Sequence, residues 1–495
     1  MKAKYLIPPF AIFGTVFLLA TGELFSGTSP SFVAMMSVTL FCIAITYNLL
    51  GGLGTFSGII FSIFSLRTIV ISQFAKALLF EAADKNLEVP QLSIAVYMTF
   101  FLCALVGIFA CGPLRFELPH PLEPETDAQG SLLYYLSFVI GAAATVALQI
   151  GMTTQGAQGA KNIGLAFSSL LLFSLVLAVH ERIKSSNGQH SFSRKAFFPW
   201  ILQIFSGYAY SSRNAMLLPS IVYLVACFVR GYRFKRRHYF AVALGLALFL
   251  LVISPFELYY RGVIADTNFK DRVYYATHPF KTTPNWAIVK ASADSSEANQ
   301  NSRESYFSRP GTGVLSRLSL IRADSNMFSA CANGFHYGWT SIKMDIGLAV
   351  PQFLNRNKSG DASSAFTGRV TGLNSDDVPN SFMVLSPIGD AFGGFGWWGV
   401  VIFPFIIFPI FFTFLDSLFD MRQPWGTVAL GAYALVSGEL TMGNTIAFMI
   451  RTPLLLFVLS YLLVTIVRLI PMKGDHEVSP LHLRAPAGPV NEDLV

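Results

Sequence analysis

Charge is scarce in this sequence. Only 13% of its 495 residues are Asp, Glu, Lys or Arg, about half the usual share in a soluble protein. Hydrophobic residues make up 53%, and they gather in blocks of roughly twenty, a length that crosses about 30 Å of hydrocarbon as a helix. A soluble core cannot hold so many segments that are apolar on every side, so the composition predicts a membrane protein.

The motif signatures of several enzyme classes are also missing. The five cysteines show no metal-ligand spacing. There is no HExxH motif and no GxSxG turn, and no P-loop or GxGxxG motif follows a strand. These absences argue against a metal enzyme and against a nucleotide-binding site, so we expect no cofactor. The net charge of +7 does not require a nucleic-acid partner, because basic loops between membrane spans account for much of it.

The apolar blocks predict an all-α, polytopic transmembrane bundle of about twelve spans. A long polar stretch, residues 256–395, separates the ninth span from the tenth, and apolar spacing within it predicts short amphipathic helices in a large loop. The predicted spans lie near Tyr5–Gly22, Phe32–Leu50, Phe56–Phe74, Leu92–Gly112, Leu132–Gly151, Ile163–Val179, Ala196–Tyr210, Ala215–Val229, Phe240–Pro255, Trp397–Phe414, Trp425–Met442 and Thr452–Leu469.

Basic residues in short loops predict the orientation of these spans. Residues 180–195 carry four Lys and Arg residues and the segment Arg230–His238 carries five, so both are expected in the cytoplasm, together with the two termini. The large loop then lies outside. The chain divides into an N-terminal bundle of about nine spans (1–255), the outer loop (256–395), C-terminal spans (396–470) and a disordered cytoplasmic tail (471–495).

Arg213 is the most informative single residue. It stands in Tyr210–Asn214 (YSSRN), at the outer mouth of the predicted eighth span, where no cytoplasmic topology signal would place it. A guanidinium at that position suits phosphate or pyrophosphate, because its planar head offers five donors. The alternative interpretation is an interfacial Arg that extends to lipid headgroups.

Further cations are spread over the outer loop. Arg261 follows the ninth span, Arg317 and Arg322 share one apolar-patterned stretch, and Lys358 follows in VPQFLNRNK. Arg317 and Arg322 would point in rather different directions on a helix, so both need not face one site. The alternative is an ordinary solvated loop in which acids such as Asp324 balance the cations.

Two acidic residues are candidates for proton transfer. Asp390 lies in the glycine-rich stretch Pro379–Gly399, where it could act as a general base, hold an Arg, or simply cap a helix. Glu439 lies within the predicted eleventh span, where an ionisable residue is a functional candidate. Arg451 lies near the outer edge of the last span.

These features together resemble the O-antigen polymerase and O-antigen ligase superfamily of bacterial inner membranes. Members of that superfamily have many spans, one large periplasmic loop late in the chain, and an SR motif at the outer start of a span before that loop. Ser212 and Arg213 in SSRNAMLLPS match this motif in residue and place. The resemblance covers Gly207–Gly399 by motif and the remainder by topology.

Two stretches of the loop bear on the choice between Wzy-type polymerases and ligases. Arg317, followed later by VPQFLNRNK, resembles the polymerase loop pattern, although Gln352 stands where an Arg is common. PNSFMVLSPIGDAFGGFGWWG resembles the HNxxxxxxxxEx(G)xxG stretch of the ligases, with Asn380 at its Asn and Asp390 near its acidic position. Pro379 stands in place of the ligase His, which favours polymerase over ligase.

The resemblance implies a metal-independent glycosyltransferase that joins undecaprenyl-pyrophosphate-linked oligosaccharide repeat units on the periplasmic face, as an O-antigen or exopolysaccharide polymerase. Its partners would be this substrate, the lipid bilayer and a chain-length regulator protein, with no nucleic acid. Displacement of pyrophosphate by a hydroxyl group demands cations for the leaving group and a base for the hydroxyl. The implied catalytic residues are Arg213, Arg317, Asp390 and Glu439, and the implied substrate-binding residues are Arg261, Arg322, Lys358, Asn380 and Arg451.

Three other functions stay open at this point. A transporter or flippase of lipid-linked saccharides would also use an Arg-lined cleft, but a large outer loop and the lack of a visible internal repeat fit it less well. An O-antigen ligase belongs to the same superfamily. A non-catalytic assembly scaffold would not need an Arg at the mouth of a span.

The predicted orientation can be checked with reporter fusions. Phosphatase is active outside the cytoplasm and β-galactosidase inside it. Fusions at Ser295 and Tyr232 should therefore report opposite sides, because Ser295 lies in the outer loop and Tyr232 in the five-cation segment. Reporters that give the same side at both positions would contradict this topology.

Overall fold

The structure is a computed structural model in which every described element is a helix. It describes residues 6–111, 127–151, 158–209, 213–249, 253, 306–308, 319–349, 366, 385–421, 423–436, 442, 445 and 452–470. The predicted all-α fold is confirmed within these ranges. Five helical stretches are long and apolar enough to cross a membrane: Pro30–Gly54, Phe56–Leu79, Pro90–Cys111, Ala128–Leu148 and Trp397–Leu418. The chain is therefore a multi-pass membrane protein.

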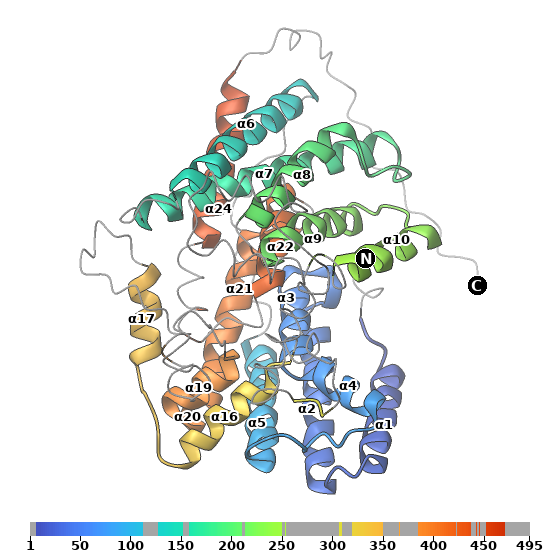
Figure 1. Cartoon of the computed structure of the whole chain (residues 1–495), viewed down its shortest axis with the longest axis vertical. Coiled ribbons are helices and arrows are strands. Elements are labelled where there is room, and N and C mark those ends of the chain that lie inside the picture. Colours follow the sequence, from blue (N-terminus) through green and yellow to red (C-terminus); the bar gives the residue numbers. More distant parts are fainter. Residues whose placement is uncertain are drawn as a thin grey trace, which may run out of the picture.

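Most of these spans belong to a first group of helices, in the lower part of Figure 1. A π-helical turn at Leu66–Val70 joins α3 to α4, so that the two form one continuous span. The group contains α1 (Pro9–Phe25), α2 (Pro30–Leu49), α3 (Phe56–Ser65), α4 (Ile71–Leu79), α5 (Pro90–Cys111), α16 (Ile321–Ala332), α17 (Thr340–Ala349), α19 (Pro387–Phe395), α20 (Trp397–Ile402) and α21 (Phe408–Leu418).

A second group of helices lies in the middle and upper part of the same view. In Figure 1, α6, α8, α9 and α10 run across the direction of α2 and α5. Helix α22 packs on α9 of its own group and on α3 of the first. The second group contains α6 (Asp127–Gly151), α7 (Gln158–Ser185), α8 (Arg194–Ala209), α9 (Arg213–Val229), α10 (Arg236–Leu248), α22 (Pro424–Val436) and α24 (Thr452–Leu469).

Close helix packing depends on phenylalanine and on small residues. Phe64 of α3 packs edge-on against Phe408 at 5.5 Å, and Phe100 of α5 does the same at 5.3 Å. A Cβ atom on Gly107 of α5 would lie only 2.4 Å from the Phe405 carbonyl oxygen. Helices in a membrane gain no hydrophobic driving force from each other, so such close backbone contact is what holds them together.

At one end of the first group, the α1–α2 and α4–α5 connections are joined by hydrogen bonds. The buried carboxylate of Glu23 accepts from the Thr28 hydroxyl at 2.6 Å and from the Ala83 amide at 2.9 Å. Asp84 accepts from the Ser29 amide at 2.9 Å. The two connections therefore form one polar layer, which covers this end of the spans.

Segments of the predicted outer loop are attached to this same layer. The Lys76 ammonium, fully buried, lies 3.4 Å from the Glu81 carboxylate and 4.3 Å from the centre of the Tyr306 ring. Arg322, near the start of α16, binds Glu88 at 2.8 Å. Helices α16 and α17 lie in the stretch that was predicted to hold short helices, and α16 docks here against α5.

Candidate functional site

Three carboxyl groups are buried where α16, α17 and α19 meet beneath the polar layer. Asp324 of α16 and Asp390 of α19 have no exposed surface, and Asp345 of α17 is 1% exposed. We refer to Asp324, Asp390 and Asp345 as the acid cluster. Buried carboxyl groups are costly unless hydrogen bonds or protons satisfy them, so the surroundings of each are informative.

Asp324 is bound by a tyrosine of α5 and by the first residues of α19. Its carboxylate accepts from the Tyr97 hydroxyl at 2.5 Å, and from the amide and hydroxyl of Ser386 at 3.0 Å and 2.5 Å. Ser386 is the N-cap of α19, where its hydroxyl oxygen accepts from the amides of Ile388 and Gly389. The carboxylate thus lies at the positive end of a helix dipole, which favours its charged form.

Asp390 lies one turn further along α19 and faces the interior. One carboxylate oxygen accepts from the Tyr337 hydroxyl at 2.5 Å, and the other accepts from the Met442 amide at 2.7 Å. Because Ser386 caps the helix, the interpretation of Asp390 as a capping residue is wrong. Asp390 instead joins α19 to the segment that follows α22.

Burial moves both carboxyl groups toward neutrality. Desolvation raises the pKa of Asp324 to about 6, against the lowering effect of its bonds to Ser386 and Tyr97. Desolvation also raises the pKa of Asp390, with Tyr337 opposing and Asp345 reinforcing that rise. Within the described ranges, no ion pair involves Asp324 or Asp390.

The arrangement is suited to proton storage and exchange. Each of two carboxyl groups contacts a tyrosine hydroxyl, and one of them has a pKa close to neutral pH. A group whose pKa lies near the ambient pH can both take and release a proton. Among the described residues no three His, Cys, Asp or Glu side chains are arranged to hold a metal ion.

The structure describes three of the nine residues predicted to form the site. Asp390 belongs to the acid cluster. Arg322 is turned instead to the α4–α5 connection, where it donates to the Asn86 carbonyl oxygen and binds Glu88. Arg213 is the first residue of α9. The remaining six lie outside the described residues: Arg261, Arg317, Lys358, Asn380, Glu439 and Arg451.

Asp324 was treated in the sequence only as an acid that balances loop cations. The spacing of its apolar neighbours could have predicted its burial. Ile321 lies three residues before Asp324, and Met327 and Phe328 lie three and four residues after it. That spacing puts an acid on the apolar face of α16. Tyr97 lies within a predicted span, and nothing in the sequence around it indicated that it would contact a buried acid.

Comparison of the chain with family models, with curated proteins and with solved structures finds no match.

Gly389 provides the space that the Asp324 carboxyl group occupies. A Cβ atom at this position would lie 2.2 Å from Asp324 Oδ1, whereas a Cβ on Gly347 of α17 would meet nothing within 4 Å. Gly389→Ala should therefore lower the free energy of unfolding by about 1–3 kcal/mol through overpacking. Gly347→Ala, the matched control, should be neutral or slightly stabilising. Thermal denaturation in detergent measures both, and equal melting temperatures would contradict this packing.

The pKa of Asp324 predicts how stability depends on pH. A carboxyl group whose pKa is raised from 3.8 to about 6 on folding favours the folded state when protonated, so that stability falls as pH rises from about 4 to about 6. The full effect is about 3 kcal/mol. Asp324→Asn removes the titration, so its melting temperature should fall less than that of the wild type between acid and neutral pH. Identical pH profiles would refute the assignment.

Proposed function

We propose that this chain is a polysaccharide polymerase: a metal-independent glycosyltransferase that joins undecaprenyl-pyrophosphate-linked oligosaccharide repeat units. It would span a bacterial inner membrane about twelve times, with both termini in the cytoplasm and the large loop in the periplasm. The substrate is then reached from the end of the bundle that carries the polar layer and the acid cluster.

The observation that carries the proposal is the position of Arg213 on α9. This helix begins at Arg213 and ends at Val229, directly before the five-cation segment Arg230–His238. Seventeen helical residues rise about 25 Å. Arg213 therefore lies at the opposite end of its helix from the strongest cytoplasmic signal in the chain. The tendency of Lys and Arg to stay in cytoplasmic loops explains the five-cation segment, but it does not explain an Arg at position 213.

A second observation connects α9 with the acid cluster. Helix α22 packs against α9 so closely that a Cβ on Gly431 would lie 2.2 Å from Val222. Shortly after α22 ends, the Met442 amide donates to Asp390. The segment between them contains Glu439. The chain that packs on the Arg213 helix is thus the one that binds the buried acid.

The reaction assigns distinct work to cations and acids. A hydroxyl group of one lipid-linked repeat attacks the anomeric carbon of another, the bond from that carbon to the pyrophosphate breaks, and the hydroxyl proton passes to a base. Arg213 and Arg317 would stabilise the charge that develops on pyrophosphate, the largest contribution expected in such a site. Asp390 or Glu439 would take the proton, and a raised pKa suits a base at neutral pH.

Substitution of Arg213 tests this role. Arg213→Lys keeps the charge but loses the bidentate fork, so activity should be impaired, and Arg213→Ala should lose about 10²-fold or more. Arg194 begins α8 and is exposed, so Arg194→Ala is a matched control that should remain active. The measurement is the length ladder of surface polysaccharide in cells that lack the chromosomal copy of the gene, at equal protein abundance.

The same cells separate the polymerase from its alternatives. Loss of a polymerase leaves single repeat units on the cell surface, whereas loss of a flippase removes them too. Loss of a ligase leaves full-length chains on the lipid carrier. Full-length ladders from Arg213→Ala at normal abundance would end the assignment of Arg213 to the site.

A further inference from the structure

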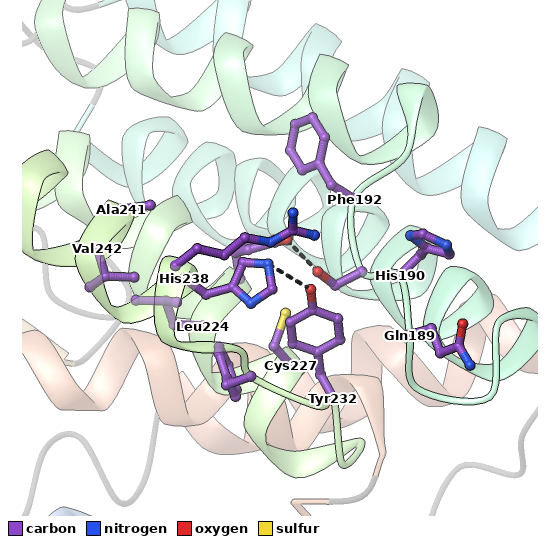
Figure 2. A pocket seen from close by; sticks show the side chains of 13 residues that line it. Gln189, His190, Phe192, Leu224, Cys227, Tyr232, His238, Ala241 and Val242 are labelled. Carbon is purple, nitrogen blue, oxygen red and sulfur yellow. Dashed lines mark hydrogen bonds between the residues drawn. The ribbon is translucent and has the colours of Figure 1, made fainter.

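A cavity of about 330 Å³ lies at the end of α9 that is remote from Arg213. As Figure 2 shows, its walls come from the α7–α8 connection, with Gln189 and His190, and from the start of α10, with His238. Arg237 also lines it, and none of its lining residues is Asp or Glu. The cavity is therefore cationic and rich in donors.

The hydroxyl group of Tyr232, which lines the cavity, can donate a hydrogen bond to a ligand. The Lys235 amide donates to His238 Nδ1 at 2.9 Å, so a neutral imidazole carries its proton on Nε2. Nε2 lies 3.3 Å from the Tyr232 hydroxyl oxygen, which accepts that proton's hydrogen bond. The hydroxyl hydrogen of Tyr232 is then directed elsewhere. Dashed lines in Figure 2 mark this contact and the neighbouring Ser191–Tyr223 bond.

The other side of the cavity is apolar and continues onto an exposed apolar surface. Phe192, Leu224 and Val242 line it, and the Phe192 and Val242 side chains are 49% and 42% exposed. Phe240, on the same helix as Val242, is 71% exposed. In a membrane protein such an exposed apolar surface is suited to contact with lipid, which would place the cavity where acyl chains meet headgroups.

The surrounding charge is almost entirely positive. Arg233, Lys235 and Arg236 are exposed beside the cavity. Residues 180–195 and 230–238 together contain a single acid, Glu181, and its carboxylate is paired with Lys195 at 2.9 Å. Nothing acidic in these two segments competes for Arg237.

We propose that this cavity binds a phosphate group, held by the Arg237 guanidinium and by donors such as the Tyr232 hydroxyl. A planar guanidinium binds phosphate with two parallel hydrogen bonds, and basic pockets between membrane helices suit anionic headgroups. The apolar wall favours a phosphate that carries acyl chains, the phosphodiester of an anionic phospholipid in the leaflet on this side. The site is independent of the proposed polymerase, whose Arg213 lies at the other end of α9.

Lipid binding to the full-length protein in neutral detergent tests the site by native mass spectrometry. Phosphatidylglycerol should bind more tightly than phosphatidylcholine of the same acyl chains. Arg237→Gln should weaken phosphatidylglycerol about tenfold, the loss expected for one charged hydrogen-bonding group. Arg236→Gln removes the same charge one residue away, at an exposed position outside the cavity, and should change binding less than about twofold. Tyr232→Phe should weaken binding less than Arg237→Gln.

The outcomes distinguish specific binding in the cavity from non-specific electrostatic attraction of anionic lipid to the basic surface. Equal losses for Arg237→Gln and Arg236→Gln, or equal binding of both lipids to the wild type, would overturn the proposal. A second experiment adds inorganic phosphate in excess. If phosphate displaces phosphatidylglycerol from the wild type and does not bind to Arg237→Gln, the cavity recognises free phosphate, and the proposal that its ligand is a phospholipid is wrong. Retention of the lipid under excess phosphate supports the phospholipid.

Discussion

Buried charge in an apolar helical bundle must find its partners within the protein, and the described structure is organised around that constraint. Water cannot solvate Lys76, Glu23 or Asp324, and each is met by backbone groups or by side chains of another segment. For Lys76 the partners are the Ala82 and Lys85 carbonyl oxygens and Glu81. These bonds determine how the connections fold over the end of the first helix group.

The same constraint attaches distant parts of the chain to one another. Asp324 binds Tyr97 and Ser386, residues that belong to a span early in the chain and to a helix late in it. Removing the Asp324 carboxylate would take away the acceptor of the buried Ser386 amide, at a cost of roughly 1–3 kcal/mol. A network of this kind stabilises one arrangement of α5, α16 and α19 over others.

Charge is distributed unevenly between the two ends of the chain's helices. In the acid cluster, Asp324 and Asp390 are buried and accept hydrogen bonds from neutral donors, and burial raises the pKa of both. Around the cavity at the end of α9, cations are exposed and acids are rare. A proposed transferase site at the first end and a phosphate site at the second would use these opposite conditions for different chemistry.

Hydropathy was enough to predict a helical membrane protein, because runs of apolar residues cross a bilayer only as helices whose backbone hydrogen bonds are internal. The sequence also singled out Asp390 as a candidate site residue, because this acid stands in a glycine-rich stretch. Three features became visible only in the folded chain: Ser386 caps α19, Asp390 accepts a hydrogen bond from Tyr337, and Asp324 accepts one from Tyr97, more than two hundred residues away. Burial and hydrogen-bond partners depend on which segments pack together, and hydropathy carries no information about such long-range contacts.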